Sequence, residues 1–418
     1  MIIFHLIYNS ARLINLFLRV ATLGARFTFI FFLSKYLDPA LLGYYGIFTA
    51  SVSYALYFVG LDFYTYVSRE IIKTPANKRG QLLKAQAALS GLLYITLFPV
   101  IVLLLFQSKW PGHLVWWFMP ILFLEHFNQE ISRLLNVLSE QLTSSVIQFI
   151  RQGSWAIAIG FLMSISPSAR NLDLIIASWA VAGLFAACIG IWKLNLLNTD
   201  GWHLPVDWAW IIKGIKVSIL LLLATLALRG VNTFDRYWLE ALSGIEAVGA
   251  YVLFLGVAST LMTFLDAAIF AFAYPILIQL NDERKYCDAH QYVKRLLMQT
   301  IAIIVVFLCI SLLLIPHLLL WIGNALYQQS EWMYSWLISA ISIYAISMVP
   351  HLALYARGLD KPIIYSHISA LLTFGAVTWL FSHLNTELSI LIGLNASFFT
   401  ILIWNSVAFI QMTNKDKT

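Results

Sequence analysis

The sequence predicts an all-α polytopic membrane protein with twelve transmembrane helices in two pseudo-symmetric six-helix bundles. Of its 418 residues, 61% are hydrophobic and only 11% are charged, whereas a soluble domain carries roughly 25% charged residues. A helical span needs about 20 mostly apolar residues. Four longer stretches contain no Asp, Glu, Lys or Arg: 85–108, 297–330, 332–356 and 388–414.

The alternation of apolar and polar segments gives the twelve expected spans. They lie at 13–35, 41–67, 84–106, 114–135, 144–164, 172–193, 214–238, 248–275, 296–320, 332–355, 363–382 and 389–411. The connections are short and contain helix-ending proline or glycine, as at 38–39 and 110–112. The longest connection, near 195–207, predicts an N-terminal six-helix bundle at 1–197 and a C-terminal six-helix bundle at 198–418.

The two halves share short sequence patterns. Span one reads Ala-Thr-Leu-Gly-Ala-Arg at 21–26, and span seven reads Ala-Thr-Leu-Ala-Leu-Arg at 224–229. Gly43-Tyr44-Tyr45 is matched by Gly249-Ala250-Tyr251. Because six spans separate the copies, this is a parallel repeat, and transporters built in this way bind substrate between the repeats near the middle of the membrane.

The orientation follows from lysine and arginine in the short loops, because these residues favour the cytoplasmic face. One set of loop ends carries three of them, Lys35, Lys109 and Arg170. The opposite set carries sixteen: Arg69, Lys73, Lys78, Arg79, Lys84, Lys193, Lys213, Lys216, Arg284, Lys285, Lys294, Arg295, Arg357, Lys361, Lys415 and Lys417. This bias predicts that both termini are cytoplasmic. The net charge of +6 therefore reflects topology, and nucleic acid is not an expected partner.

One stretch, 229–251, places charge inside an apolar region. Arg229 follows the apolar run 217–228, and Asp235 and Arg236 come about two turns later. A charge in the middle of the bilayer costs at least ~2.5–3.5 kcal/mol on insertion scales, so such residues are candidates for function. After a short loop come an acidic residue, Glu246, and the sequence Val-Gly-Ala-Tyr at 248–251.

This stretch resembles the middle of the Wzx-type, RfbX-like polysaccharide flippases of the multidrug/oligosaccharidyl-lipid/polysaccharide exporter superfamily. Leu-Ser-Lys-Tyr-Leu at 33–37 with Leu-Gly-Tyr-Tyr at 42–45 resembles the opening hairpin of that family. Gly-Leu-Asp at 60–62 and Ser-Arg-Glu-Ile at 68–71 resemble the end of its second span. Together these pieces cover about a quarter of the chain.

The resemblance implies a MATE-like fold, with the two six-helix bundles around a central cavity, and a non-enzymatic transport function. The expected substrate is an undecaprenyl-diphosphate-linked oligosaccharide, such as an O-antigen unit used in lipopolysaccharide biosynthesis, flipped across the bacterial inner membrane. Membrane lipids, a polysaccharide polymerase and a chain-length regulator are the expected partners, and no cofactor is expected. The arginines of the family's first and seventh spans correspond to Arg26 and Arg229.

Several charged residues are candidates for substrate binding. Two arginines facing one water-filled space would bind an anion, because guanidinium matches phosphate with two parallel hydrogen bonds. For Arg26 and Arg229 a structural ion pair is the alternative. Four further residues are candidates for substrate binding. Glu125 lies in the middle of a span, Arg19 lies on the same helix face as Arg26, and Asp235 and Arg236 lie near the end of span seven.

Two aspartates are candidates for ion coupling. Folding of the first hairpin puts Asp62 at the depth of Arg19, which predicts a structural ion pair. Asp266 has no charged residue at its depth in span seven, where Leu221 and Leu222 lie. Burial without a partner favours the neutral acid, so Asp266 is a candidate proton carrier. The alternative is a structural pair with Arg151.

Two rival functions remain. A polysaccharide polymerase or ligase would need a substantial outward loop with catalytic residues, and every outward loop here is short. A drug or cation exporter of the same superfamily would be expected to have an acidic or apolar cavity. The sequence has no Gly-x-x-x-x-Gly-Lys-Ser/Thr phosphate-binding loop, and its three cysteines have no metal-binding spacing.

Overall fold

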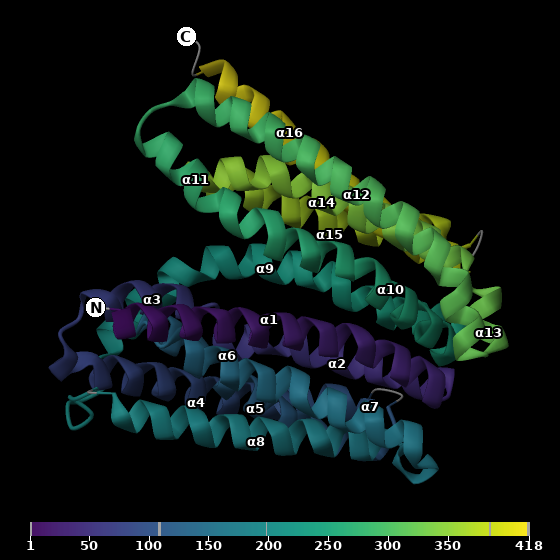
Figure 1. The fold of residues 1–418 in the computed structure, drawn as a ribbon, viewed down its shortest axis with the longest axis horizontal. Coiled ribbons are helices and arrows are strands. Elements are labelled where there is room, and N and C mark those ends of the chain that lie inside the picture. The colour runs from purple at the N-terminus through teal and green to yellow at the C-terminus, as the bar shows by residue number, and fades with distance from the viewer. Residues whose placement is uncertain (1, 108–109, 198, 384–385, 416–418) are drawn as a thin grey trace. The chain divides into compact units, whose positions relative to one another are not determined.

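The computed structural model describes residues 2–107, 110–197, 199–383 and 386–415, and in these ranges it contains helices and no strands (Figure 1). The first half comprises α1 (Ile2–Tyr36), α2 (Pro39–Gly60), α3 (Tyr64–Lys73), α4 (Ala76–Gln107), α5 (Gly112–Val137), α6 (Gln141–Phe149), η1 (Ile150–Ser154), α7 (Trp155–Ile165), η2 (Pro167–Ala169) and α8 (Leu172–Leu196). The second comprises α9 (Trp208–Ser243), α10 (Ile245–Leu265), η3 (Asp266–Phe270), α11 (Ala271–Asp282), α12 (Tyr286–Ile322), α13 (Ala325–Gln329), α14 (Trp332–Ala356), α15 (Asp360–Phe381) and α16 (Thr386–Lys415).

The predicted fold class, an all-helical multi-span membrane protein, is confirmed. Within the described residues, ten helices are long and apolar enough to cross a membrane, and α2 with α3 gives an eleventh, bent by 50°. The remaining predicted span is α5, which is 26 residues long. Its second half is polar, because it carries Glu125, Glu130 and Arg133. Two loop residues used for the orientation, Lys109 and Lys417, lie outside the described residues.

The chain divides into two compact units. Unit 1 is Met1–Leu37 with Phe48–Leu222, and unit 2 is Asp38–Ile47 with Leu223–Thr418. The division runs through α2 and α9, and the connection at 195–207 lies inside unit 1. Each unit is described separately below.

Unit 1 is held together by close packing of α5 on α8 and of α1 on α6 and α7. Small residues allow the approach: a Cβ on Gly183 would lie 3.3 Å from Leu124, and one on Gly190 would lie 2.8 Å from Ile131. Asn128 strengthens the same seam, because its side-chain nitrogen donates to the Gly183 carbonyl oxygen at 2.9 Å. The seam fixes the polar half of α5 inside the unit.

In unit 2, α14 packs on α10 and α16, and α15 packs on α16 (Figure 1). The first turns of α2 also belong to this unit, and they meet α10 at two glycines. A Cβ on Gly43 would lie 2.2 Å from the Ile245 carbonyl oxygen, and one on Gly249 would lie 2.0 Å from the Pro39 carbonyl oxygen. Each glycine thus meets the residue four positions before the other glycine. These glycines are at matched positions of the predicted repeat, and their contacts are reciprocal.

Three breaks in regular helix lie next to charged residues. The π-helical turns η1 and η3 interrupt two spans, and η3 begins at Asp266. Such turns are rare and occur frequently at functional sites. Between α2 and α3 the backbone adopts positive φ at Leu61 and Asp62, 49° and 50°, which non-glycine residues seldom do. These breaks displace side chains from where a continuous helix would put them.

Candidate functional site

The charged group of unit 2 consists of Arg229 on α9, Asp266 on η3 and Tyr344 on α14. Arg229 is close enough to both Asp266 and Tyr344 to interact with them electrostatically. Arg229 and Asp266 are both exposed, while Tyr344 packs on Phe398 with ring centroids 4.9 Å apart. Three different elements therefore bring a cation, an anion and a phenol to one place.

This arrangement corrects the expectation for Asp266. We expected it to lack a charged neighbour within its own hairpin, but Arg229 on the preceding helix interacts with it. The expectation compared backbone depths alone. An arginine side chain extends several bonds along the helix axis on its apolar stem, and the π-helical turn redirects Asp266. Side-chain reach therefore supplies the charged neighbour that backbone depth did not predict.

In unit 1, two arginines of α1 face α6 and η1. Arg26 is exposed, and its Nη1 donates to Gln152 Oε1 on η1 at 3.4 Å. Arg19 is also exposed, and its Nε donates to Ser145 Oγ on α6 at 3.4 Å. Both repeat-related arginines, Arg26 and Arg229, therefore have a polar partner on a π-helical turn.

The expected pair of Arg19 with Asp62 is wrong. Arg19 contacts Ser145, whereas Asp62 is buried at 6% exposure in the bend after α2. The prediction assumed a straight second span to residue 67. The helix instead ends at Gly60 and the chain turns by 50°, which moves Asp62 off the helix axis.

Glu125 forms a buried ion pair inside unit 1. Its Oε2 lies 2.9 Å from Arg151 Nη1, and the two side chains are only 9% and 6% exposed. Trp179 donates to Glu125 Oε1 at 2.8 Å, and Trp155 donates to the Arg151 carbonyl oxygen at 2.8 Å. The two indoles stack with centroids 6.0 Å apart.

Two expectations change with this pair. Glu125 was a candidate for substrate contact, but its carboxylate is satisfied inside the helix packing. Arg151 was the alternative partner of Asp266, but it is held by Glu125. A buried charge requires a matched partner, and the sequence did not show which of several distant charges would supply it.

Asp235, in the central stretch, is also a structural residue. Its carboxylate is fully buried and accepts from the Tyr251 hydroxyl at 2.6 Å and from the Arg236 backbone nitrogen at 2.7 Å. The Arg236 guanidinium lies 3.5 Å from the same carboxylate and donates to the Asn232 carbonyl oxygen. The expected substrate contacts of Asp235 and Arg236 are therefore corrected: this part of the motif joins the end of α9 to the start of α10.

The candidate site is thereby reduced to Arg26 in unit 1 and the Arg229–Asp266 group in unit 2. That the two arginines share a cavity stays a prediction. Each presents an exposed guanidinium, whose five donors suit a phosphate or carboxylate ligand. Within the part of the chain that the structure describes, no group of three or more His, Cys, Asp or Glu residues can hold a metal ion.

Known structures share the fold. An inward-facing multidrug resistance MATE family transporter of the MOP superfamily is 12% identical, with 95% of each chain covered and a TM-score of 0.77. A substituted form of a Vibrio cholerae MATE transporter is 13% identical, covering 97% of this chain and 96% of its own, with a TM-score of 0.66. A MOP superfamily transporter from Pyrococcus furiosus, described as having a binding pocket of reverse polarity that suggests a different function, is 13% identical, covering 98% and 95%, with a TM-score of 0.60.

At these identities the likeness establishes the fold. The chain has the fold of MATE family transporters over nearly its whole length. No protein-family model and no curated protein matches the sequence. The function therefore has to be argued from the charged residues that this chain places on the fold.

Proposed function

We propose that the protein is a membrane transporter that flips an undecaprenyl-diphosphate-linked oligosaccharide from the cytoplasmic to the periplasmic leaflet of the bacterial inner membrane by alternating access. One observation carries the proposal: an exposed arginine lies inside the first span of each repeat, Arg26 on α1 and Arg229 on α9. Arginine in the bilayer interior is costly and rare. A ligand with two phosphate groups would compensate both charges.

The chemistry of the arginines favours an anionic substrate. Guanidinium forms two parallel charge-assisted hydrogen bonds with a phosphate, and a diphosphate offers one phosphate for each arginine. At Arg26 the partner already present is a weak competitor, because Gln152 is neutral and meets Arg26 at 3.4 Å. The resemblance to polysaccharide flippases at 33–45, 60–71 and 229–251 points to the same class of substrate.

Export of a drug or cation is the rival function. It is favoured by the solved structures of the same fold, of which one is described as a multidrug resistance transporter. A cationic substrate would need carboxylates at the site. In the described residues, Glu125 forms an ion pair with Arg151 and Asp235 accepts a hydrogen bond from Tyr251, whereas Asp266 is exposed near Arg229. The balance of charge at the candidate site therefore favours an anion.

The deciding experiment reconstitutes the purified protein in lipid vesicles. A fluorescent undecaprenyl-diphosphate saccharide is incorporated, and a membrane-impermeant reductant bleaches the outer leaflet. The protein is expected to raise the bleached fraction from about half towards completeness, because inner-leaflet substrate reaches the outer leaflet. A parallel set of vesicles tests uptake of a lipophilic cation. Cation uptake without movement of the saccharide lipid would overturn the proposal in favour of the rival.

The Arg229–Asp266 group suggests how transport is coupled to protons. A diphosphate that binds Arg229 competes with Asp266 for the same cation, and a carboxylate that loses its cation in an apolar setting takes up a proton. Asp266→Asn is therefore expected to leave insertion intact and to make transport insensitive to a pH gradient. Asp288→Asn, an exposed aspartate at the start of α12, is the matched control. Unchanged pH dependence in the Asp266→Asn variant would exclude Asp266 as the proton carrier.

A further inference from the structure

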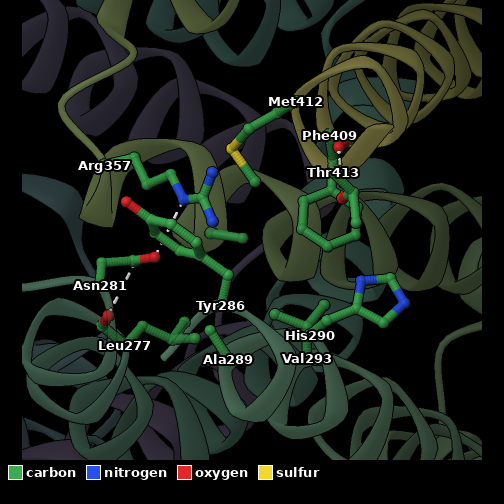
Figure 2. Close-up of a pocket in the computed structure, with 11 residues that line it drawn as sticks. Leu277, Asn281, Tyr286, Ala289, His290, Val293, Arg357, Phe409, Met412 and Thr413 are labelled. Atoms are coloured by element: carbon green, nitrogen blue, oxygen red, sulfur yellow. Dashed lines mark hydrogen bonds between the residues drawn. The ribbon is translucent and has the colours of Figure 1, made fainter. Parts of the chain in front are cut away.

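A polar pocket lies in unit 2, at the end of the bundle where α11 is followed by α12 and α14 ends. Its polar side chains include Asn281, Tyr286, His290 and Arg357, and its walls include Val293 and Phe409. Figure 2 shows the Tyr286, His290 and Arg357 side chains around this pocket.

Arg357 is held in position at this pocket by two neighbours. Its Nε donates to Asn281 Oδ1 at 2.9 Å, and its guanidinium carbon lies 4.4 Å from the Tyr286 ring centroid (Figure 2). The hydrogen bond at Nε and the contact with the Tyr286 ring fix the orientation of the Arg357 guanidinium before a ligand binds. Preorganisation of this kind lowers the entropy cost of binding.

His290 supplies a second polar group. Its ring stacks on Phe409 of α16, with centroids 5.7 Å apart and planes within 4°. Its Nδ1 is buried and has no hydrogen-bond partner among the described residues. A buried polar atom without a hydrogen-bond partner is unfavourable, so a ligand that hydrogen-bonds to this nitrogen removes that cost.

The surroundings of the pocket combine positive charge with apolar surface. Residues 277–295 and 353–361 carry six basic and four acidic side chains, and one acid, Glu283, is paired with Lys285 at 2.7 Å. On the two helices that contribute His290 and Phe409, apolar side chains are exposed, such as Ile301 and Ile410 at 43% and 56%. The phosphate of a membrane lipid could thus reach the pocket while its acyl chains lie along α12 and α16.

We infer that this pocket binds the phosphate headgroup of an anionic phospholipid, with Arg357 and His290 as its ligands. The loop bias places this end of the bundle at the cytoplasmic face, where anionic lipids attract basic residues. The site is separate from Arg229 and Asp266, and it does not depend on the proposed transport function.

The test measures lipid binding by the full-length protein in detergent. Phosphatidylglycerol is expected to raise the apparent Tm by at least about 3 °C, because a ligand of the native state stabilises it. Phosphatidylcholine, which carries phosphate without net negative charge, is expected to have no such effect. An equal rise with inorganic phosphate would overturn the lipid assignment, because the headgroup alone would then account for binding.

Two variants locate the effect. Arg357→Met keeps much of the packing and loses the charge, and His290→Phe keeps the stacking on Phe409 and loses both nitrogens. Each is expected to weaken phosphatidylglycerol binding by about tenfold or more, since charge-assisted bonds are the strong ones. Lys213→Gln removes an exposed lysine in unit 1 and is expected to bind as the wild type does. Wild-type binding by both pocket variants would overturn the inference.

Discussion

Replacement of Arg229 by alanine is expected to reduce flipping of the saccharide lipid by at least about tenfold, because a charge-assisted hydrogen bond contributes roughly 1.5–3 kcal/mol and 1.4 kcal/mol corresponds to a factor of ten. Arg26→Ala is expected to have the same effect for the same reason. Lysine at either position should restore transport in part, since it keeps the charge and loses the two-pronged geometry. The measurement is the bleaching assay in vesicles.

The control has to distinguish the loss of substrate binding from the general effect of removing any positive charge from the protein. Arg69 on α3 is an exposed arginine of unit 1 outside the candidate site. Arg69→Ala should therefore transport at the wild-type rate. All variants are compared at equal amounts of inserted protein. Wild-type transport by both Arg26→Ala and Arg229→Ala would contradict the proposed anion site.

The second large effect is expected at Gly249. A Cβ at this position would lie 2.0 Å from the Pro39 carbonyl oxygen, a backbone atom that cannot rotate away. Gly249→Ala must therefore separate α10 from the first turns of α2. Overpacking of a tight contact costs about 1–3 kcal/mol. The expected result is a clear fall in the apparent Tm at a fixed heating rate, and Gly43→Ala should act in the same direction.

Gly375 provides the matched control, because it also lies inside a helix, α15, and a Cβ there would meet nothing within 4 Å. Gly375→Ala is expected to leave the Tm unchanged or to raise it slightly, since alanine is favoured over glycine in helices by up to about 1 kcal/mol. If Gly249→Ala and Gly375→Ala unfold at the same temperature, the close contact of α2 with α10 does not stabilise the protein.

The sequence by itself determined the fold class. Runs of more than 20 apolar residues have to become helices in a bilayer, because each backbone polar group needs a partner within its own segment. The sequence also predicted an internal repeat, with which the reciprocal contacts of Gly43 and Gly249 are consistent. Depth and repeat position selected Arg26 and Arg229 as candidates; both are exposed, and their role in binding stays a prediction.

Only the tertiary structure decided which charges are partners. Glu125 forms an ion pair with Arg151, and Asp266 lies near Arg229. Asp235 accepts hydrogen bonds from Tyr251 and from the Arg236 backbone. In a membrane helix a charge must find its partner on another helix, and sequence spacing carries little information about that distance. Helix breaks at Asp62 and Asp266 also change the direction of these side chains from that in a continuous helix. The depth of a charge could thus be estimated from the sequence, whereas its partner depended on how the helices pack.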